Sequence, residues 1–211
     1  MRFSLSIFAA IVATVLAAPA QQSYECDVSA VALALPSGLG VPGGVKPKYI
    51  ALGFGTQNYT CSSAGTYTSA GAVAKLLDIS CLTKSNPQLF RDVHEYAYRL
   101  RGRQDLLEDL LEPYINIHFL GSHYFISQDG AIAPKFDFGQ SGHGYVVSKK
   151  TGGAPSPDGS QNVDWLELQN TSGSLAKYVF RVDTQGGQPP ASCKAGQAVN
   201  VQYTSKYWFF N

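Results

Sequence analysis

Charge is scarce in this sequence, and neither sign dominates. Asp, Glu, Lys and Arg together make up 15% of the 211 residues, and the formal net charge at pH 7 is +1. A chain so nearly neutral produces no strong field of one sign over its surface. Nucleic acid, whose binding depends on clusters of basic residues, is therefore not an expected partner.

An apolar run long enough to span a membrane is also missing. The run Leu5–Leu16 has about a dozen residues, whereas a membrane-spanning helix needs roughly twenty. Arg2 precedes this run and small residues at 18–20 follow it, a pattern typical of a secretory signal peptide. We therefore predict that residues 1–20 are removed, and that residues 21–211 form a single secreted, extracellular domain with no membrane anchor.

Closely spaced cysteine pairs are absent as well. The four cysteines, Cys26, Cys61, Cys81 and Cys193, form no C-x-x-C motif, which excludes a thioredoxin-like redox centre and a common zinc-binding spacing. An even number of cysteines in an oxidising compartment predicts two disulfides. Three pairings are possible, and the residues alone do not choose between them. We expect no metal site at these cysteines.

Two short motifs bear on modification of a secreted chain. Asn58-Tyr59-Thr60 and Asn170-Thr171-Ser172 both match the acceptor pattern for N-glycosylation. Such triplets also arise by chance. If the host is eukaryotic, Asn58 and Asn170 are the predicted glycosylation sites.

Apolar residues mostly alternate with polar or small ones, which is the pattern of β-strands. Together with 21 glycines and 12% aromatic residues, this alternation favours an all-β fold, either an antiparallel β-sandwich or a partly open β-barrel. In the last predicted strand, Thr204 and Lys206 lie on the face opposite Tyr203 and Tyr207, and we interpret that strand as half-buried. The predicted strands are Val31–Leu35, Tyr49–Cys61, Ile115–Phe119, Val163–Leu168, Tyr178–Val182 and Val199–Phe210.

One segment breaks the alternation. Asn86 and Pro87 are typical of the start of a helix, and apolar residues then recur at helical spacing up to Gly102. A second, short helix is predicted to end at Pro113. We interpret residues 86–112 as a short helical insertion whose charged face is exposed to solvent.

Two glycine-rich stretches look like nucleotide-binding loops. Residues 38–43 match the G-x-G-x-x-G pattern, but that pattern binds a dinucleotide only where its glycines open a helix. Pro42 and Pro47 follow instead, and Gly53 and Gly55 run into a predicted strand. We therefore expect no nucleotide cofactor, and no other cofactor is indicated.

The candidate catalytic residues are His123 and Asp129. A histidine and a carboxylate near one strand end can share a cleft and act as acid and base, although Asp129-Gly130 is also typical of a hairpin turn. His118 and His123 can share a metal only if Gly121 forms a bulge, because their spacing puts them on opposite faces of a regular strand. Further carboxylates that can supply a pair for glycan chemistry are Asp137, Asp164, Glu167 and Asp183.

Five blocks of the sequence carry a resemblance to a known family. In chain order they are Gly53-Phe54-Gly55-Thr56-Gln57-Asn58-Tyr59-Thr60-Cys61, Gly121-Ser122-His123-Tyr124-Phe125, Val163-Asp164-Trp165-Leu166, Arg181-Val182-Asp183-Thr184-Gln185-Gly186-Gly187 and Tyr203-Thr204-Ser205-Lys206-Tyr207-Trp208-Phe209-Phe210. The chain thereby resembles a family of small secreted proteins, mainly fungal with bacterial relatives, that is classed as a domain of unknown function. Its members often carry the automatic label malate dehydrogenase. The resemblance implies a Cys61–Cys193 disulfide and, with it, a Cys26–Cys81 disulfide.

Two classes of function are consistent with these features. The leading hypothesis is a noncatalytic module that binds a cell-wall, matrix or host ligand, either glycan or protein, through its glycine-rich loops and exposed rings. The alternative is a secreted hydrolase or lyase that acts on a glycan. We do not expect malate dehydrogenase activity, because that chemistry needs a helix-terminal phosphate site for the nicotinamide cofactor.

Overall fold

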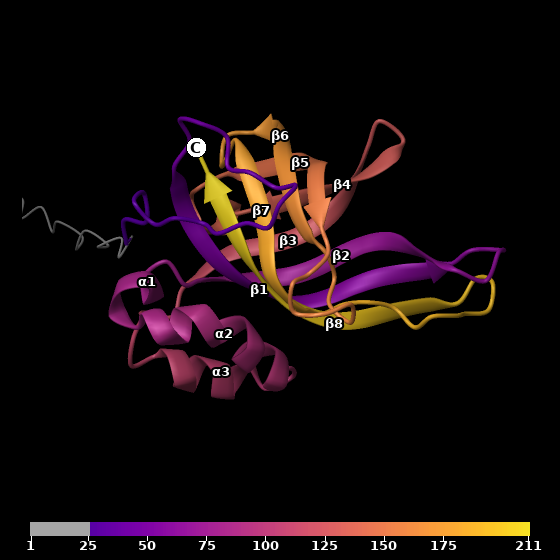
Figure 1. The fold of residues 1–211 in the computed structure, drawn as a ribbon, viewed down its shortest axis with the longest axis horizontal. Helices are drawn as coiled ribbons and strands as arrows, with labels where there is room; N and C mark the ends of the chain where they lie inside the picture. Colours follow the sequence, from indigo (N-terminus) through magenta and orange to yellow (C-terminus); the bar gives the residue numbers. More distant parts are fainter. Residues whose placement is uncertain (1–25) are drawn as a thin grey trace, which may run out of the picture.

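The protein forms a closed barrel of eight antiparallel strands, in which each strand pairs with the next along the chain and the last pairs with the first (Figure 1). This architecture comes from a computed structural model that describes residues 26–211. The predicted signal peptide, residues 1–20, lies outside the described residues. The strands are β1 (Pro47–Cys61), β2 (Tyr67–Asp78), β3 (Phe119–Gln128), β4 (Ala131–Asp137), β5 (Tyr145–Ala154), β6 (Trp165–Gly173), β7 (Tyr178–Gly186) and β8 (Ala198–Phe210).

The predicted all-β class is confirmed, and the barrel is closed rather than partly open or split into a sandwich. Closure depends on β1 and β8, which pair from Pro47↔Phe210 to Thr60↔Ala198. A closed barrel leaves no unpaired sheet edge. At their far ends β1, β2 and β8 continue beyond the other strands as a three-stranded arm, formed by residues 58–61, 67–71 and 198–200 (Figure 1).

Two predicted strands are wrong in whole or in part. Residues 31–35 form no strand, although Val31, Leu33 and Leu35 do pack their side chains against the outside of the barrel. Alternating burial without backbone pairing produced the misleading signal. The strand predicted at Ile115–Phe119 starts too early, because β3 begins only at Phe119.

Both faces of much of the sheet are buried, which gives the protein two cores. The inner core lies inside the barrel, and the outer core lies between the barrel wall, the helices and the segment before β1 (Figure 1). In β8, Tyr203 and Tyr207 point into the barrel, while Thr204 and Lys206 are buried on the other face. The interpretation of this strand as half-buried is therefore wrong for residues 203–210, because the helices cover the face predicted to meet solvent.

Three helices between β2 and β3 cover the outer core: α1 (Leu82–Ser85), α2 (Pro87–Arg99) and α3 (Gln104–Leu111). The predicted start of α2 is confirmed, since the Asn86 side chain accepts a hydrogen bond from the Leu89 N–H at 3.0 Å. Two α2 carbonyls also accept hydrogen bonds from β8, so the helix is held by polar as well as apolar contacts. Among residues 26–211, no helix is long and apolar enough to cross a membrane.

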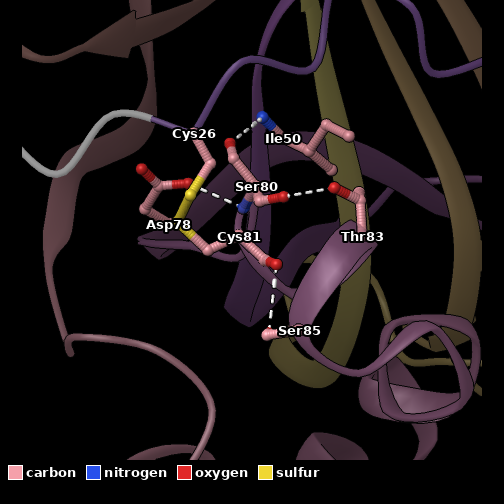
Figure 2. The surroundings of a disulfide bond; sticks show 7 residues. All are labelled: Cys26, Ile50, Asp78, Ser80, Cys81, Thr83 and Ser85. Atoms are coloured by element: carbon pink, nitrogen blue, oxygen red, sulfur yellow. Dashed lines mark hydrogen bonds between the residues drawn. A yellow bond between two sulfur atoms is a disulfide. The ribbon is translucent and has the colours of Figure 1, made fainter.

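Both disulfides implied by the family resemblance are confirmed. Cys61 and Cys193 join the end of β1 to the loop before β8, at the tip of the arm, with Cα atoms 5.9 Å apart. Cys26 and Cys81 join the segment before β1 to the residue preceding α1, with Cα atoms 5.1 Å apart (Figure 2). Beside this second bond, the Ser80 hydroxyl accepts a hydrogen bond from the Ile50 N–H, which anchors the turn to β1.

Candidate ligand cavity in the barrel

A cavity of about 660 Å³, partly open to solvent, extends into the barrel and is lined by residues of the strands from β3 to β8. Inward-facing side chains form its walls because residues two apart on a strand point to the same face. The turn between β3 and β4 lies at one end of it. The side chains that line it include those of His123, Phe125, Phe136, Leu168, Arg181 and Tyr207.

Aromatic rings pack closely at the base of the cavity. The His123 ring stacks on Phe136 with centroids 4.3 Å apart and an interplanar angle of 11°. The Tyr207 ring lies 5.5 Å from His123, and its hydroxyl is 2.8 Å from the Tyr203 hydroxyl. Gly53 makes this packing possible, because a Cβ there would lie 2.5 Å from the Tyr207 ring. The first block of the family resemblance therefore has a packing role.

His123 is a neutral hydrogen-bonding group at pH 7. Its Nδ1 atom lies 3.0 Å from the Lys135 carbonyl oxygen, which can only accept, so Nδ1 carries the proton and donates. Only 3% of the residue is exposed. Burial lowers the pKa of His123 to about 4, and the nearby charge of Arg181 also acts to lower it. The other ring nitrogen, Nε2, is left as an acceptor.

We predict that the free energy of unfolding falls as the pH drops from 6.5 towards 4. The unfolded chain takes up a proton near the ordinary histidine pKa of 6.5, whereas folded His123 stays neutral down to about pH 4. Protons therefore favour the unfolded state between pH 6.5 and pH 4. The stability that neutral His123 contributes is fully present only above pH 6.5 and is lost as the pH falls. The expected loss through His123 is about 2 kcal/mol between pH 7 and pH 5.

Urea unfolding at pH 7 and pH 5 measures this effect. In His123→Phe, whose ring can keep the stack on Phe136, the decrease should be about 2 kcal/mol smaller than in the unsubstituted protein. His118→Gln, at an exposed position, controls for the loss of a histidine. An unchanged pH dependence in His123→Phe would contradict the prediction.

Arg181 places a cation inside the barrel. The residue is 9% exposed, and its Nε and Nη2 atoms both donate to the Asp164 carbonyl oxygen, at 3.1 and 2.8 Å. A guanidinium has five N–H groups, so three remain unused by these bonds. Within residues 26–211 no carboxylate forms an ion pair with Arg181. The buried Ser148 hydroxyl, also on the cavity wall, has no hydrogen-bond partner among the described residues.

The structure places both candidate catalytic residues on the cavity wall but far apart. Asp129 lies in the β3–β4 turn, where it and Gly130 have φ angles of 51° and 80°, so the predicted hairpin turn is confirmed. Gln128, which precedes Asp129, is five positions along β3 from His123, and this corresponds to roughly 17 Å of strand. Direct proton transfer between the two side chains requires hydrogen-bond distance. The barrel does not bring them together, and a catalytic role for either stays a prediction.

The remaining candidates do not assemble a second site. His118 is exposed, whereas His123 is buried, even though a register shift beside Gly121 provides the expected bulge. In the part of the chain that the structure describes, no group of three or more His, Cys, Asp or Glu residues could hold a metal ion. Asp137 pairs with Lys135 at 2.9 Å. Of the carboxylates considered for glycan chemistry, Asp129 alone lies on the cavity wall, whereas that chemistry uses two.

Other sequence candidates have structural roles. Gly53 and Gly55 lie within β1, and residues 38–43 are followed by β1 rather than a helix, so neither stretch has the context of a nucleotide-binding loop. Both N–H groups of the Asn170 amide are used, by the Gly173 and Ala176 carbonyls. Glycan attachment at Asn170 would have to break one of these bonds. Glycosylation at Asn58 and Asn170 stays a prediction.

Sequence reasoning missed Arg181 as a site residue. Arg181 stands in β7 between Phe180 and Val182, which are both fully buried in the outer core. An arginine flanked by apolar residues in a short strand is a signal that it points inward to a cavity or a partner. Reading it correctly requires knowing that the opposite face of the strand is buried as well.

The fold and the cavity define a small antiparallel barrel protein with a partly open cavity of about 660 Å³ that extends into the barrel. The family whose model matches residues 42–211 is described as protein of unknown function (DUF3455), and the chain belongs to this family. The matched region contains all eight strands and all three helices. No curated protein and no solved structure matches the chain.

Proposed function

We propose that this protein is a secreted, noncatalytic binding protein that holds a small ligand inside its barrel. The cavity carries this proposal: its volume of about 660 Å³ falls within the range of small-molecule sites, about 300–1,000 Å³. Barrels of eight strands are just wide enough to hold one small ligand. Phe125 and Leu168 supply apolar wall, while Arg181, Ser148 and His123 supply a few polar groups, which is the composition expected of such a site.

Secretion is supported by the two disulfides, since such bonds persist in oxidising compartments. In this proposal the signal peptide at residues 1–20 directs export, and the ligand comes from the cell wall, the matrix or a host. In this proposal the ligand contacts the wall of the cavity, rather than the glycine-rich loops that the sequence suggested. Leu39, Val41 and Val45 of the loop before β1 pack against the outer core, so this loop already has a structural role.

Binding of a neutral, polarity-sensitive dye tests the proposal. N-phenyl-1-naphthylamine should bind purified, disulfide-intact protein saturably with one site per chain. Ser148→Phe, which puts a ring on the cavity wall, should weaken this binding by about tenfold or more, because the site has little spare width. Ser63→Phe, at an exposed position in the β1–β2 turn, is the matched control and should bind as the unsubstituted protein does.

Near-ultraviolet circular dichroism establishes that each variant is folded before it is titrated. Dye binding that is absent, non-saturable or equally strong in folded Ser148→Phe would overturn the proposal.

A further inference from the structure

We propose that the ligand of the cavity is an organic anion with an apolar body, and that Arg181 binds its carboxylate. This inference rests on the proposed function, because it names the ligand class for the same site. It is carried by the position and the bonding of Arg181, by the balance of charges around the cavity, and by the apolar wall.

Arg181 is a buried cation without a counterion in the described residues. Within the sheet, Arg181 lies opposite Tyr207 of β8 and Leu166 of β6. It is therefore in the middle of its strand rather than at a strand end. Its two hydrogen bonds go to a single neutral oxygen, the Asp164 carbonyl. A buried charge is costly unless it is paired. The three remaining N–H groups have the fork geometry that matches a carboxylate.

The other charged residues around the cavity reinforce this preference. Lys149 and Lys150 lie on its wall, and among the described residues Asp129 is the single carboxylate there. His123 contributes no charge at pH 7, because burial lowers its pKa to about 4. Cations therefore outnumber anions around this space, although the whole chain has a formal net charge of only +1. The electrostatic potential in the cavity therefore favours a negatively charged ligand.

The rest of the wall favours an apolar body. Phe125, Pro134, Leu166 and Leu168 line the cavity, and Phe136 lies at its base, fully buried. Apolar surface of a ligand that leaves water for such a wall contributes to binding in proportion to its area. One guanidinium beside an apolar space therefore matches a singly charged, amphipathic acid better than a polyanion or a sugar.

Competition against the neutral dye tests the ligand class. Dodecanoate and 1-dodecanol, which share a chain and differ in charge, are each titrated at pH 7 against protein loaded with N-phenyl-1-naphthylamine. The concentration of dodecanoate that displaces half of the dye should be at least about tenfold lower than that of 1-dodecanol, because hydrogen bonds to charged partners are the stronger ones. In Arg181→Gln this preference should disappear, and in Arg181→Lys part of it should remain.

Lys177→Gln is the matched control, since it removes an exposed cation that does not line the cavity. It should change the preference by less than about threefold, because exposed charges are screened by solvent and salt. A preference that survives in Arg181→Gln, or that vanishes in Lys177→Gln, would overturn the assignment to Arg181.

The outcomes separate this inference from the proposed function. If the dye binds but the acid and the alcohol displace it equally, or neither displaces it, the anion proposal is wrong and the binding function stands. If the dye itself does not bind, the proposed function is wrong. If Arg181→Gln does not fold, the test uses the ratio of the displacing concentrations of 1-dodecanol and dodecanoate. A ratio that is equally high in the unsubstituted protein and in Arg181→Lys would overturn the assignment, and a lower ratio in Arg181→Lys would support it.

Discussion

Replacing Cys61 and Cys193 together by alanine is expected to lower the free energy of unfolding by about 4 to 5 kcal/mol. The bond joins residues 132 positions apart, and cross-linking so long a loop restricts the unfolded chain strongly. The native arm should keep its shape, because the Cys61 N–H donates to the Gln197 carbonyl at 2.8 Å and the Cys61 carbonyl accepts from the Gly196 N–H at 2.9 Å. Urea unfolding of the double variant at pH 7 measures the loss.

The Cys26→Ala, Cys81→Ala double variant is the natural comparison. Its bond closes a shorter loop, with a separation of 55, so the chain-entropy contribution should be about 1 kcal/mol smaller. Each double variant retains the other disulfide and leaves no unpaired thiol. A loss below about 1 kcal/mol for the Cys61–Cys193 bond would contradict the prediction, since it would place the effect outside the chain-entropy range.

Replacing Asp183 by asparagine is expected to destabilise the protein by about 3 kcal/mol, because it leaves a buried cation unpaired. The Lys206 side chain is 2% exposed, and its Nζ lies 2.9 Å from Asp183 Oδ2. That nitrogen also donates to the Arg91 carbonyl and lies 4.8 Å from the centre of the Phe90 ring. Burial lowers the pKa of Lys206, and the Asp183 carboxylate opposes that shift.

The asparagine substitution removes the charge with little disturbance of the backbone. Asp183 has a φ of 50°, a left-handed conformation that asparagine also adopts readily. Asp183 sits at a register shift between β7 and β8, and this bulge directs its carboxylate to Lys206. The side chain is 29% exposed, so we place the expected loss at the lower end of the range for buried pairs, about 3 to 5 kcal/mol.

Lys206→Met controls for the pair itself, because it removes the cation and keeps an apolar chain beneath α2. It should cost about 1 kcal/mol, less than Asp183→Asn, and the double variant should be close to Lys206→Met alone. Urea unfolding of the three variants completes a double-mutant cycle. Additive losses in that cycle would show that the two side chains are not coupled.

Local signals predicted several elements of this fold correctly. The Asn86 side chain caps α2, and Asp129-Gly130 turns the chain between β3 and β4, because a cap and a two-residue turn depend on a few neighbouring residues. The strands rich in small or charged residues were missed. β2 contains three alanines and a glycine among its twelve residues, and β5 contains successive lysines and successive glycines. In both, pairing with neighbouring strands outweighs weak intrinsic preference.

The candidate site was predictable only in part. His123 was chosen for its residue type, and the structure does place it on the cavity wall. The partner chosen for it, Asp129, lies at the other end of the hairpin, since distance along a strand grows by about 3.3 Å per residue. The apolar neighbours of Arg181 indicate only that it is buried, and those of Lys206 do the same. Which of the two points into the barrel and which lies beneath α2 depends on what covers each face of the strand.

By itself the sequence determined the β-rich class, the helical insertion at residues 86–112 and the even set of cysteines, because periodicity, capping and residue counts are properties of short segments or of composition. Only the tertiary structure decided that β1 pairs with β8 to close the barrel, that both faces of β8 are buried, and that Arg181 shares a cavity with His123. These features depend on which distant segments meet. An alternating pattern specifies that a strand has two faces, but when both faces are covered it cannot specify what each one meets.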